Sequence, residues 1–502
     1  MSTRRGPSGF DRREFLAYTA AGAAGLLLPD WLRAQTAPSP GAAAGAKPNI
    51  IIIVADDLGY ADIGVHGCKD IPTPNIDSIA ANGVRCASGY VTCPVCSPTR
   101  AGLLTGRYQQ RFGHEHNPAG QVSDFGLPLS ETLLPKVLGG AGYATGMVGK
   151  WHLGEREGYW PNDRGFAEFF GFLTGGRTYL PNPAAPPIYR NREVVKEAEY
   201  LTDAFTREAV AFIDRRQKQP FFLYLTYNAV HTPMNAHPKS WARLEHIENR
   251  RRKTYGSMLL AMDDGIGAVL KKLRDAGIEP DTLVFFISDN GGPIREGSVN
   301  GSSNAPLREG KTWLYEGGVC VPYLVQWPAR LAAGKVYDQP VSSLDIFATA
   351  LAAAGAQPPD KPLDGADLLP HLAGQLVTAE RAVAGLVTAE RAVAGLVTAK
   401  RAVAGKNQPP HEMLFWRYGP FKAVRCGPLK LVRQGKGPEL FDVVKDPGEQ
   451  TNLAAQRPDD VKRLDEALAQ WEKGLVKPLW PLAPGAAPTQ PTSRPQTQPA
   501  RA

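Results

Sequence analysis

Several short runs of hydrophobic residues along the chain end abruptly at polar side chains. Residues 49–55 form an almost continuous run of β-branched residues that stops at Asp56 and Asp57. Such a run predicts a strand that is buried on both faces, as in a parallel sheet. Similar runs predict further strands at 144–148, 221–227 and 282–288.

Between these strands, apolar residues recur at the period of a helix. The pattern predicts helices over 75–82, 129–138, 200–216 and 255–276. Strands that alternate with helices indicate an α/β domain, and we expect a large, mostly parallel sheet sandwiched by helices.

The pattern changes after residue 356. Short alternating runs predict four antiparallel strands, at 413–417, 421–426, 429–432 and 439–443, and a helix over 459–474. We therefore expect a large α/β domain over 47–356 and a smaller C-terminal α+β domain over 357–477. Residues 478–502 are rich in Pro, Ala, Thr and Gln and predict a disordered tail.

The first 37 residues resemble an export signal rather than part of the fold. Arg12 and Arg13 precede Phe-Leu, a short Ala/Gly/Leu-rich stretch and small residues suited to a signal peptidase. We expect a Tat signal over 1–37 and a linker over 38–46, with the Tat translocon as a partner. The protein would then be periplasmic or secreted, and no run is long enough for a stable membrane span.

Residues 376–405 contain a ten-residue unit three times, with Lys400 replacing Glu in the third copy. A period of ten fits neither a coiled-coil heptad nor a solenoid repeat. We interpret the repeat as a tandem duplication in a surface connection, where insertions are tolerated.

Composition narrows the classes of function. The 57 basic and 49 acidic residues give a net charge of +8, without a long basic run, so nothing specific supports nucleic-acid binding. Five cysteines besides Cys96 are scattered along the chain and do not form a disulfide framework.

Polar residues follow the predicted strands at their carboxyl ends, where open α/β sheets bind ligands. They are Asp56, Asp57, Lys150, His152, His231, Asp289 and Asn290. Three carboxylates and an amide suit a hard cation, calcium or magnesium, better than zinc. Arg100, Lys150 and Lys311 could supply positive charge beside it, so the set suits a tetrahedral oxyanion ester as substrate.

Cys96 lies in a tight loop that leads into a short helix, with Pro98 near the helix start. The helix dipole and Arg100 favour an anion there. Three interpretations compete for the cysteine: a small buried hydrophobe, a redox pair with Cys93, or a residue that carries chemistry on an anionic substrate.

Several motifs together resemble the type I sulfatases of the alkaline-phosphatase-like superfamily, from Lys47 to about Leu453. Cys96-Ser97-Pro98-Thr99-Arg100 matches their C-x-P-[ST]-R signature. Further matches are Ala55-Asp56-Asp57-Leu58-Gly59, Gly149-Lys150-Trp151-His152, Ser288-Asp289-Asn290-Gly291-Gly292, Gly310-Lys311 and Leu440-Phe441-Asp442. The resemblance implies an alkaline-phosphatase-like fold and a sulfuric ester hydrolase.

The resemblance also implies a mechanism. In that family the signature cysteine is oxidised to formylglycine by a maturase, and one hydroxyl of the hydrated aldehyde at position 96 would coordinate Ca²⁺ and attack sulfur. Asp56, Asp57, Asp289 and Asn290 would hold the metal. Arg100 and Lys150 would orient the modified residue, and Lys150 and Lys311 would bind sulfate oxygens. His231 would protonate the leaving alcohol, assisted by Lys311, and His152 would take the proton from the second hydroxyl and expel sulfate.

The stretch from Gly106 to Glu115 resembles arylsulfatases and N-acetylgalactosamine-6-sulfatases. It implies a sulfated carbohydrate as substrate, with His114 and Glu115 lining the pocket. The chain departs from the family at Cys320, where members often carry Arg. Two alternatives remain: a phosphomonoester or phosphonate hydrolase of the same superfamily, and a non-catalytic protein that binds sulfated glycans when Cys96 is not matured.

Overall fold

The computed structural model describes residues 47–118, 126–294, 299–373 and 409–482. The expected export signal, the linker and the decapeptide repeat lie outside these ranges, as does most of the expected C-terminal tail. The described helices are too short or too polar to cross a membrane.

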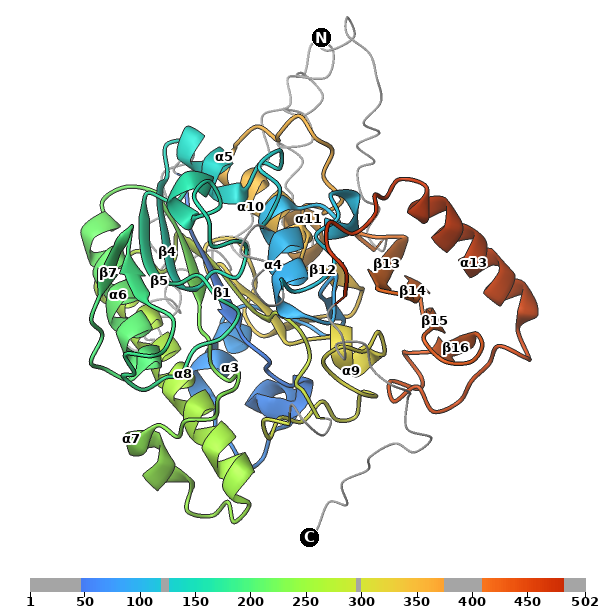
Figure 1. Cartoon of the computed structure of the whole chain (residues 1–502), viewed down its shortest axis with the longest axis horizontal. Coiled ribbons are helices and arrows are strands. Elements are labelled where there is room, and N and C mark those ends of the chain that lie inside the picture. The colour runs from blue at the N-terminus through green and yellow to red at the C-terminus, as the bar shows by residue number, and fades with distance from the viewer. Residues whose placement is uncertain (1–46, 119–125, 295–298, 374–408, 483–502) are drawn as a thin grey trace, which may run out of the picture. The chain divides into compact units, whose positions relative to one another are not determined.

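A ten-stranded sheet forms the centre of the structure, as predicted (Figure 1). Its strand order is β11-β2-β10-β9-β1-β8-β4-β5-β6-β7. The four central strands β9, β1, β8 and β4 run parallel, and β5 extends them in the same direction. The sheet is mixed because β10, β6 and β7 pair antiparallel. The strands are β1 (Asn49–Ala55), β2 (Val84–Cys86), β4 (Ala144–Lys150), β5 (Glu168–Phe172), β6 (Ile188–Arg190), β7 (Glu193–Val195), β8 (Phe221–Thr226), β9 (Thr282–Ser288), β10 (Tyr323–Gln326) and β11 (Lys335–Tyr337).

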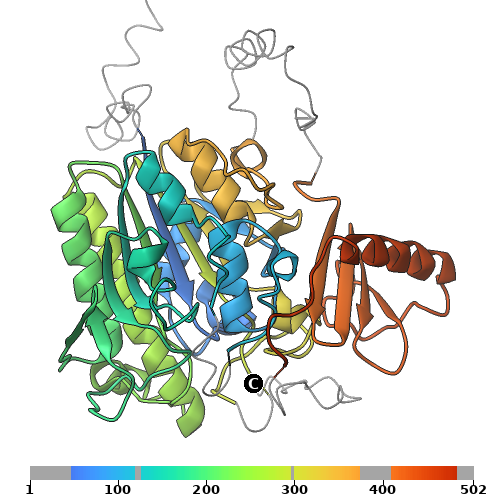
Figure 2. The same cartoon turned by 45° about the horizontal axis from the view of Figure 1, so that its top comes forward.

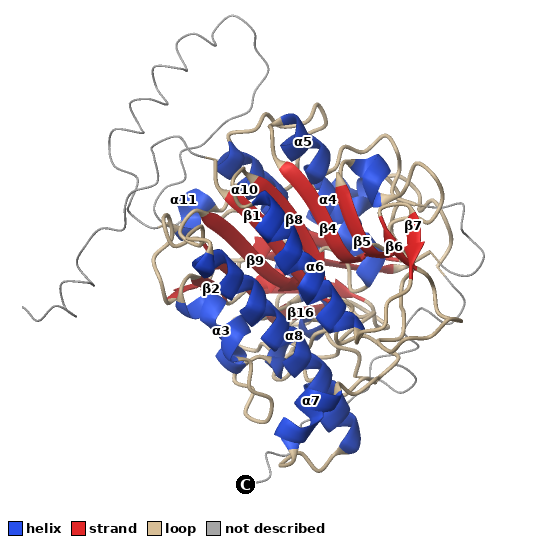
Figure 3. Cartoon of the chain, turned by 90° about the vertical axis from the view of Figure 1, so that its left-hand side faces the viewer, coloured by secondary structure: helices blue, strands red, loops and turns tan. Residues whose placement is uncertain are grey.

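Helices cover both faces of this sheet (Figure 3). On β1, Ile51 and Ile53 face a core shared with α3, α6 and α8, whereas Ile50 and Ile52 face a core shared with α4, α5 and α10. The continuous apolar run is therefore explained by burial on both sides. The helices are α3 (Pro74–Ala81), α4 (Cys96–Thr105), α5 (Leu134–Gly140), α6 (Leu201–Arg216), α7 (Pro238–Trp241), α8 (Arg250–Asp275), α9 (Glu316–Val319), α10 (Asp345–Ala354) and α11 (Leu369–Leu372).

A separate antiparallel sheet of four strands stands beside the large sheet, with one long helix on it (Figure 2). It comprises β13 (Met413–Tyr418), β14 (Phe421–Cys426), β15 (Leu429–Arg433), β16 (Glu439–Asp442) and α13 (Pro458–Glu472). Its Trp416 is buried in one cluster with Tyr90 and Cys93. The small sheet is thus packed against the segment that leads into α4. In that segment, β3 (Gly89–Tyr90) pairs with β12 (Val341–Ser342), from a distant part of the chain, to form a two-stranded sheet.

Two helices begin elsewhere than expected. Helix α5 starts at Leu134 rather than at residue 129, and Leu129 is 60% exposed, so its apolar side chain is not part of a buried face. Helix α8 starts at Arg250 rather than at residue 255, because the side chain of Asn249 accepts a hydrogen bond from the Arg252 amide and caps the helix there.

Two segments pack differently from the expected domain plan. Leu368 and Leu372, expected in the C-terminal domain, belong to the core under the large sheet. Trp480, in the expected disordered tail, is buried. Its indole donates a hydrogen bond to the carbonyl of His116 at 3.2 Å and its ring meets that of His114 edge-on. The chain is therefore ordered at least to this residue.

Candidate active site

Four neighbouring parallel strands deliver their polar side chains to one edge of the large sheet. Asp56 and Asp57 follow β1, Asp289 and Asn290 follow β9, Lys150 ends β4, and the loop after β8 carries His231. The structure thus brings together the residues that the sequence placed at four strand ends, because parallel strands present their carboxyl ends at the same edge.

A close approach of two strands fixes the end of β4. Gly149 has φ +119°, and a Cβ there would lie 1.9 Å from the carbonyl oxygen of Thr226 on β8. Only glycine fits both conditions. Lys150 follows directly, and its ammonium donates to Oδ2 of Asp56 at 2.6 Å in the protein interior.

Each of the two aspartates after β1 has a lysine partner. Lys311 donates to Oδ1 of Asp57 at 2.6 Å, as Lys150 does to Asp56. Burial opposes ionisation of Asp57, but Lys311 and then His231 outweigh it and hold the pKa of this carboxyl far below its usual range. The carboxylate is therefore ionised at neutral pH.

The donor set fits a hard divalent cation. Asn290 donates to Asp57 through Nδ2 at 2.7 Å, while its Oδ1 is buried and has no hydrogen-bond donor within the described part of the chain. Ligand atoms of Asp56, Asp57, Cys96 and His231 all lie within 4.8 Å of one another. An unpaired amide oxygen beside two carboxylates suits Ca²⁺ or Mg²⁺. His231 joins this cluster although the sequence had assigned it only to proton transfer.

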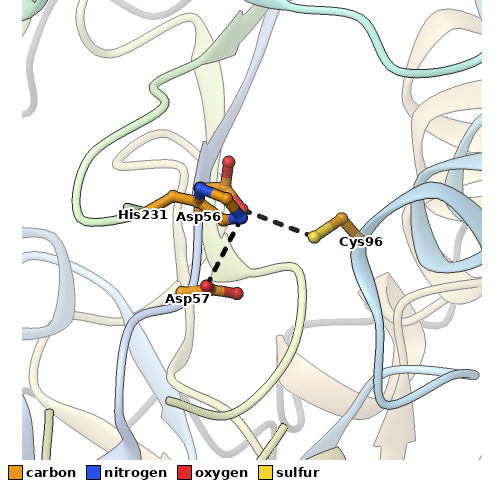
Figure 4. A group of neighbouring side chains, drawn as sticks. All are labelled: Asp56, Asp57, Cys96 and His231. Atoms are coloured by element: carbon orange, nitrogen blue, oxygen red, sulfur yellow. Dashed lines mark hydrogen bonds and ion pairs between the residues drawn. The ribbon is translucent and has the colours of Figure 1, made fainter. Parts of the chain in front are cut away.

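Cys96 is the first residue of α4 and lies opposite these carboxylates (Figure 4). Its Sγ is 3.6 Å from Oδ1 of Asp56 and 3.4 Å from Nζ of Lys311. Burial opposes formation of the thiolate, but Lys150 and Lys311 outweigh it and lower the pKa of Cys96 to about 7. The environment at this position therefore favours an anion.

Cys93 does not share this environment. Burial raises the pKa of its thiol well above the usual value, and its Sγ contacts the carbonyl of Glu115 at 3.9 Å. All six cysteines are free. The contacts give no support to a redox pair of Cys93 and Cys96.

Arg100 connects three parts of the site from one turn further along α4. Its Nε and Nη2 donate to Oδ2 of Asp289 at 3.0 and 2.7 Å, and its Nη1 donates to the carbonyl of Lys150 at 3.1 Å. A buried guanidinium that reaches both strands fixes their ends relative to α4.

The two histidines have opposite protonation preferences. Burial, then Lys150 and Arg100, lower the pKa of His152 well below its usual value, so that its ring is neutral. Burial also disfavours the charged form of His231, but Asp56 and Asp57 outweigh it and raise its pKa. One ring is suited to accept a proton and the other to donate one.

The sequence missed the role of Ser97. Its hydroxyl lies 2.6 Å from Nε2 of His114 and donates to the carbonyl of His152 at 2.6 Å. Ser97, the residue after Cys96, thus links the start of α4 to the loop that carries His152. Its place inside the signature motif was the only signal in the sequence.

His114 and Glu115 are both buried and engaged with protein groups. His114 pairs with Ser97, and the carboxylate of Glu115 accepts hydrogen bonds from the guanidinium of Arg417 on β13. The structure therefore places both residues behind the Cys96 loop, and their contact with substrate stays a prediction.

Comparison with known proteins agrees with this geometry. Residues 48–356 match the family model described as Sulfatase. N-acetylgalactosamine-6-sulfatase of Mus musculus is 40% identical over 362 residues, which cover 67% of this chain and 68% of that protein. Arylsulfatase A of Bos taurus is 32% identical over 511 residues, covering 89% of this chain and 93% of the relative.

Solved structures show the same likeness in three dimensions. Ps i-CgsB in complex with k-i-k-neocarrahexaose superposes with a TM-score of 0.76 at 35% sequence identity. The match covers 86% of this chain and 94% of that one. The likeness therefore extends over the large sheet and the small one alike.

Proposed function

Since this chain belongs to the sulfatase family and is a sulfuric ester hydrolase, we propose that it cleaves sulfate monoesters of carbohydrates at the site around Cys96. The convergence of four parallel strand ends supports this most. This arrangement places oxygen ligands for a hard cation around Cys96. It also places the ammonium groups of Lys150 and Lys311 there, so that the position favours an anion. Such a site neutralises a tetrahedral oxyanion and the charge that grows on its leaving oxygen.

The proposed cofactors are Ca²⁺ and formylglycine derived from Cys96. Asp56, Asp57 and the unpaired oxygen of Asn290 fit the metal, with Asp289 and position 96 completing the expected set. When present, calcium would offset negative charge at the sulfate and formylglycine would supply an oxygen nucleophile in place of the thiol.

The chain's own residues have the following roles in this proposal. Lys150 and Lys311 bind sulfate oxygens, and Arg100 holds the ends of β9 and β4 in place. His231 donates a proton to the oxygen of the leaving alcohol, with assistance from Lys311. His152 accepts the proton whose loss accompanies release of sulfate.

The names of the relatives favour a sugar sulfate as substrate. One relative is named for N-acetylgalactosamine 6-sulfate, and the solved neighbour carries a bound carbohydrate, k-i-k-neocarrahexaose. Export by the Tat translocon after modification by a formylglycine-generating maturase completes the proposal, with the periplasm or the exterior as the place of action.

The test is to produce the chain together with a formylglycine-generating maturase and to measure hydrolysis of 4-nitrophenyl sulfate and 4-nitrophenyl phosphate. We expect the sulfate to be the better substrate, and mass spectrometry of the Cys96 peptide to show the aldehyde. Active protein with an unmodified thiol contradicts the formylglycine. A better turnover of phosphate favours the phosphoester hydrolase. Binding of sulfated sugar without hydrolysis, by protein in which the maturase leaves Cys96 unmodified, favours the non-catalytic alternative.

Two variants separate the cysteines. Cys96→Ser should abolish activity, whereas Cys93→Ser should retain most of it because its thiol faces the apolar core. Equal loss in both variants would revive the redox interpretation.

A further inference from the structure

The segment Thr174–Tyr179 runs past both histidines of the site, and we refer to it as the glycine segment. A Cβ built on Gly175 would lie 2.6 Å from Nε2 of His152. A Cβ built on Gly176 would lie 3.4 Å from Cε1 of His231. Backbone without side chains therefore borders the site at both rings.

Hydrogen bonds hold the glycine segment against the loop that carries His231. The hydroxyl of Tyr179 donates to the carbonyl oxygens of His231, at 2.9 Å, and of Asn228. The side chain of Asn228 donates to the carbonyl of Arg177 at 3.3 Å, and Thr178 donates to Oδ1 of Asn235 at 2.8 Å. The segment and the loop therefore form one unit, so the space beside His231 is defined by fixed backbone.

Backbone conformation does not explain these two glycines. Neither residue lies in the left-handed region that excludes most side chains, in contrast to Gly149. At Gly176 the three heavy atoms nearest to the added carbon would be Cε1 and Nδ1 of His231 and the carbonyl oxygen of Thr232, at 3.4, 3.6 and 3.7 Å. These are distances at or near ordinary van der Waals contact, so a side chain fits there sterically. What the glycine provides is the absence of a side chain beside the Cε1 edge of His231.

We propose that Gly176 determines specificity for the leaving alcohol, by leaving room beside His231 for a bulky, ring-shaped alcohol such as a sugar. The inference rests on the proposed function, which assigns His231 to the leaving oxygen. Nδ1 of His231 is engaged with the carbonyl of Thr232 at 2.5 Å, and Nε2 faces Asp57 at 3.7 Å. A side chain at 176 would cover the Cε1 edge between these two nitrogens and narrow the space that the alcohol occupies.

Gly175 differs from Gly176 in the consequence of adding a side chain. At 2.6 Å the added carbon is too close to the His152 ring, which must move. Gly175 is thus a positioning residue, and its replacement should harm every substrate alike. Variants of the two neighbouring glycines therefore form a matched pair. Those at Gly176 should change the selectivity for substrate size, and that at Gly175 should lower activity on every substrate.

The experiment compares Gly176→Ala and Gly176→Val with wild type on N-acetylgalactosamine 6-sulfate and on the small, planar 4-nitrophenyl sulfate. The ratio of kcat/KM for sugar to kcat/KM for aryl sulfate should fall about tenfold with Ala and further with Val, as when groups are added to a fitted pocket. Gly175→Ala should lower both values without changing the ratio. Gly140→Ala, where the added carbon meets nothing within 4 Å, should change neither.

The outcomes are distinguishable. An unchanged ratio in both Gly176 variants, or a wild type that hydrolyses only the aryl sulfate, overturns this inference and leaves sulfatase activity standing. A modified wild type that releases sulfate from neither compound refutes the proposed function instead. Thermal melting of each variant shows whether it is folded, and Gly176→Ala, the smallest change, keeps the test open if Val prevents folding.

Discussion

Glu115 and Arg417 are 302 positions apart in the sequence and form an ion pair in which the glutamate is buried and the arginine partly buried, with Nε of the arginine 2.9 Å from Oε2 of the glutamate. Glu115 lies on the loop behind α4, and Arg417 lies on the first strand of the small sheet. The pair therefore joins the small sheet to the back of the active site, and the first prediction concerns its energy.

Arg417→Met should destabilise the protein by about 3–5 kcal/mol, because it leaves the carboxylate of Glu115 buried without its partner. The double variant Glu115→Gln/Arg417→Met should recover most of that loss. Unfolding in guanidinium chloride measures both. Arg243→Met, which breaks an exposed pair with Asp264, is the control and should cost less than about 1 kcal/mol. The prediction is wrong if the two single variants cost the same.

The second prediction concerns the metal. Removal of calcium with EGTA should lower the melting temperature and abolish sulfate release, since the carboxylates after β1 and the amide of Asn290 would lose the cation between them. Adding calcium back should restore both, and magnesium should do so less well because it demands stricter geometry. In Asp57→Asn/Asn290→Ala the melting temperature should no longer respond to calcium. A response equal to that of wild type would place the ion elsewhere.

The third prediction concerns Lys311. Replacement by Gln should lower kcat on 4-nitrophenyl sulfate by about 10²–10³-fold, the effect expected when one charged donor to a developing oxyanion is removed. Lys271→Gln, which breaks an exposed helical pair with Asp275, is the matched control and should keep wild-type kcat. A loss of less than threefold in Lys311→Gln would remove this lysine from the sulfate site.

The fourth prediction concerns pH. Burial, together with Glu316 and against the attraction of Lys430, raises the pKa of Glu449 from 4.5 to about 8. The folded protein therefore keeps a proton that the unfolded chain releases between pH 4.5 and 8, so this group makes the free energy of unfolding fall as pH rises through that window. The slope from one such group is at most about 1.4 kcal/mol per pH unit.

Glu449→Gln should flatten this slope, so that the free energy of unfolding at pH 8 lies closer to its value at pH 5 than it does in wild type. Its amide oxygen can still accept the hydrogen bond from the Glu316 amide, which Glu449 now accepts at 2.7 Å. Glu466 is exposed on α13, and Glu466→Gln should keep the wild-type slope. Chemical denaturation at several pH values between 5 and 8 decides the matter, and a variant slope equal to that of wild type would contradict the prediction.

The sequence patterns predicted most accurately the strands that are buried on both faces of the sheet. The expected bounds 49–55 and 282–288 coincide with β1 and β9, because burial on both sides leaves no polar position within the run. Strand β5 was missed, since Gly171 interrupts a short aromatic run and glycine is a common turn signal. The start of α5 was wrong because periodicity cannot tell a buried leucine from an exposed one.

The sequence was sufficient to locate the site, but it did not predict the contacts that hold the site's residues in place. Asp56, Lys150 and Asp289 stand beside runs that predict strands, so elementary sheet topology brings them together. No local pattern links Glu115 to Arg417 or places the glycine segment beside two histidines. These relationships depend on packing between segments that are distant along the chain.

Every residue of α4 is buried, and Cys96 itself is only 1% exposed. A protein catalyst that binds the residues flanking Cys96 cannot reach them once α4 has packed between the large sheet and α10. Under the proposed function, the enzyme that oxidises Cys96 would therefore have to act before the chain folds.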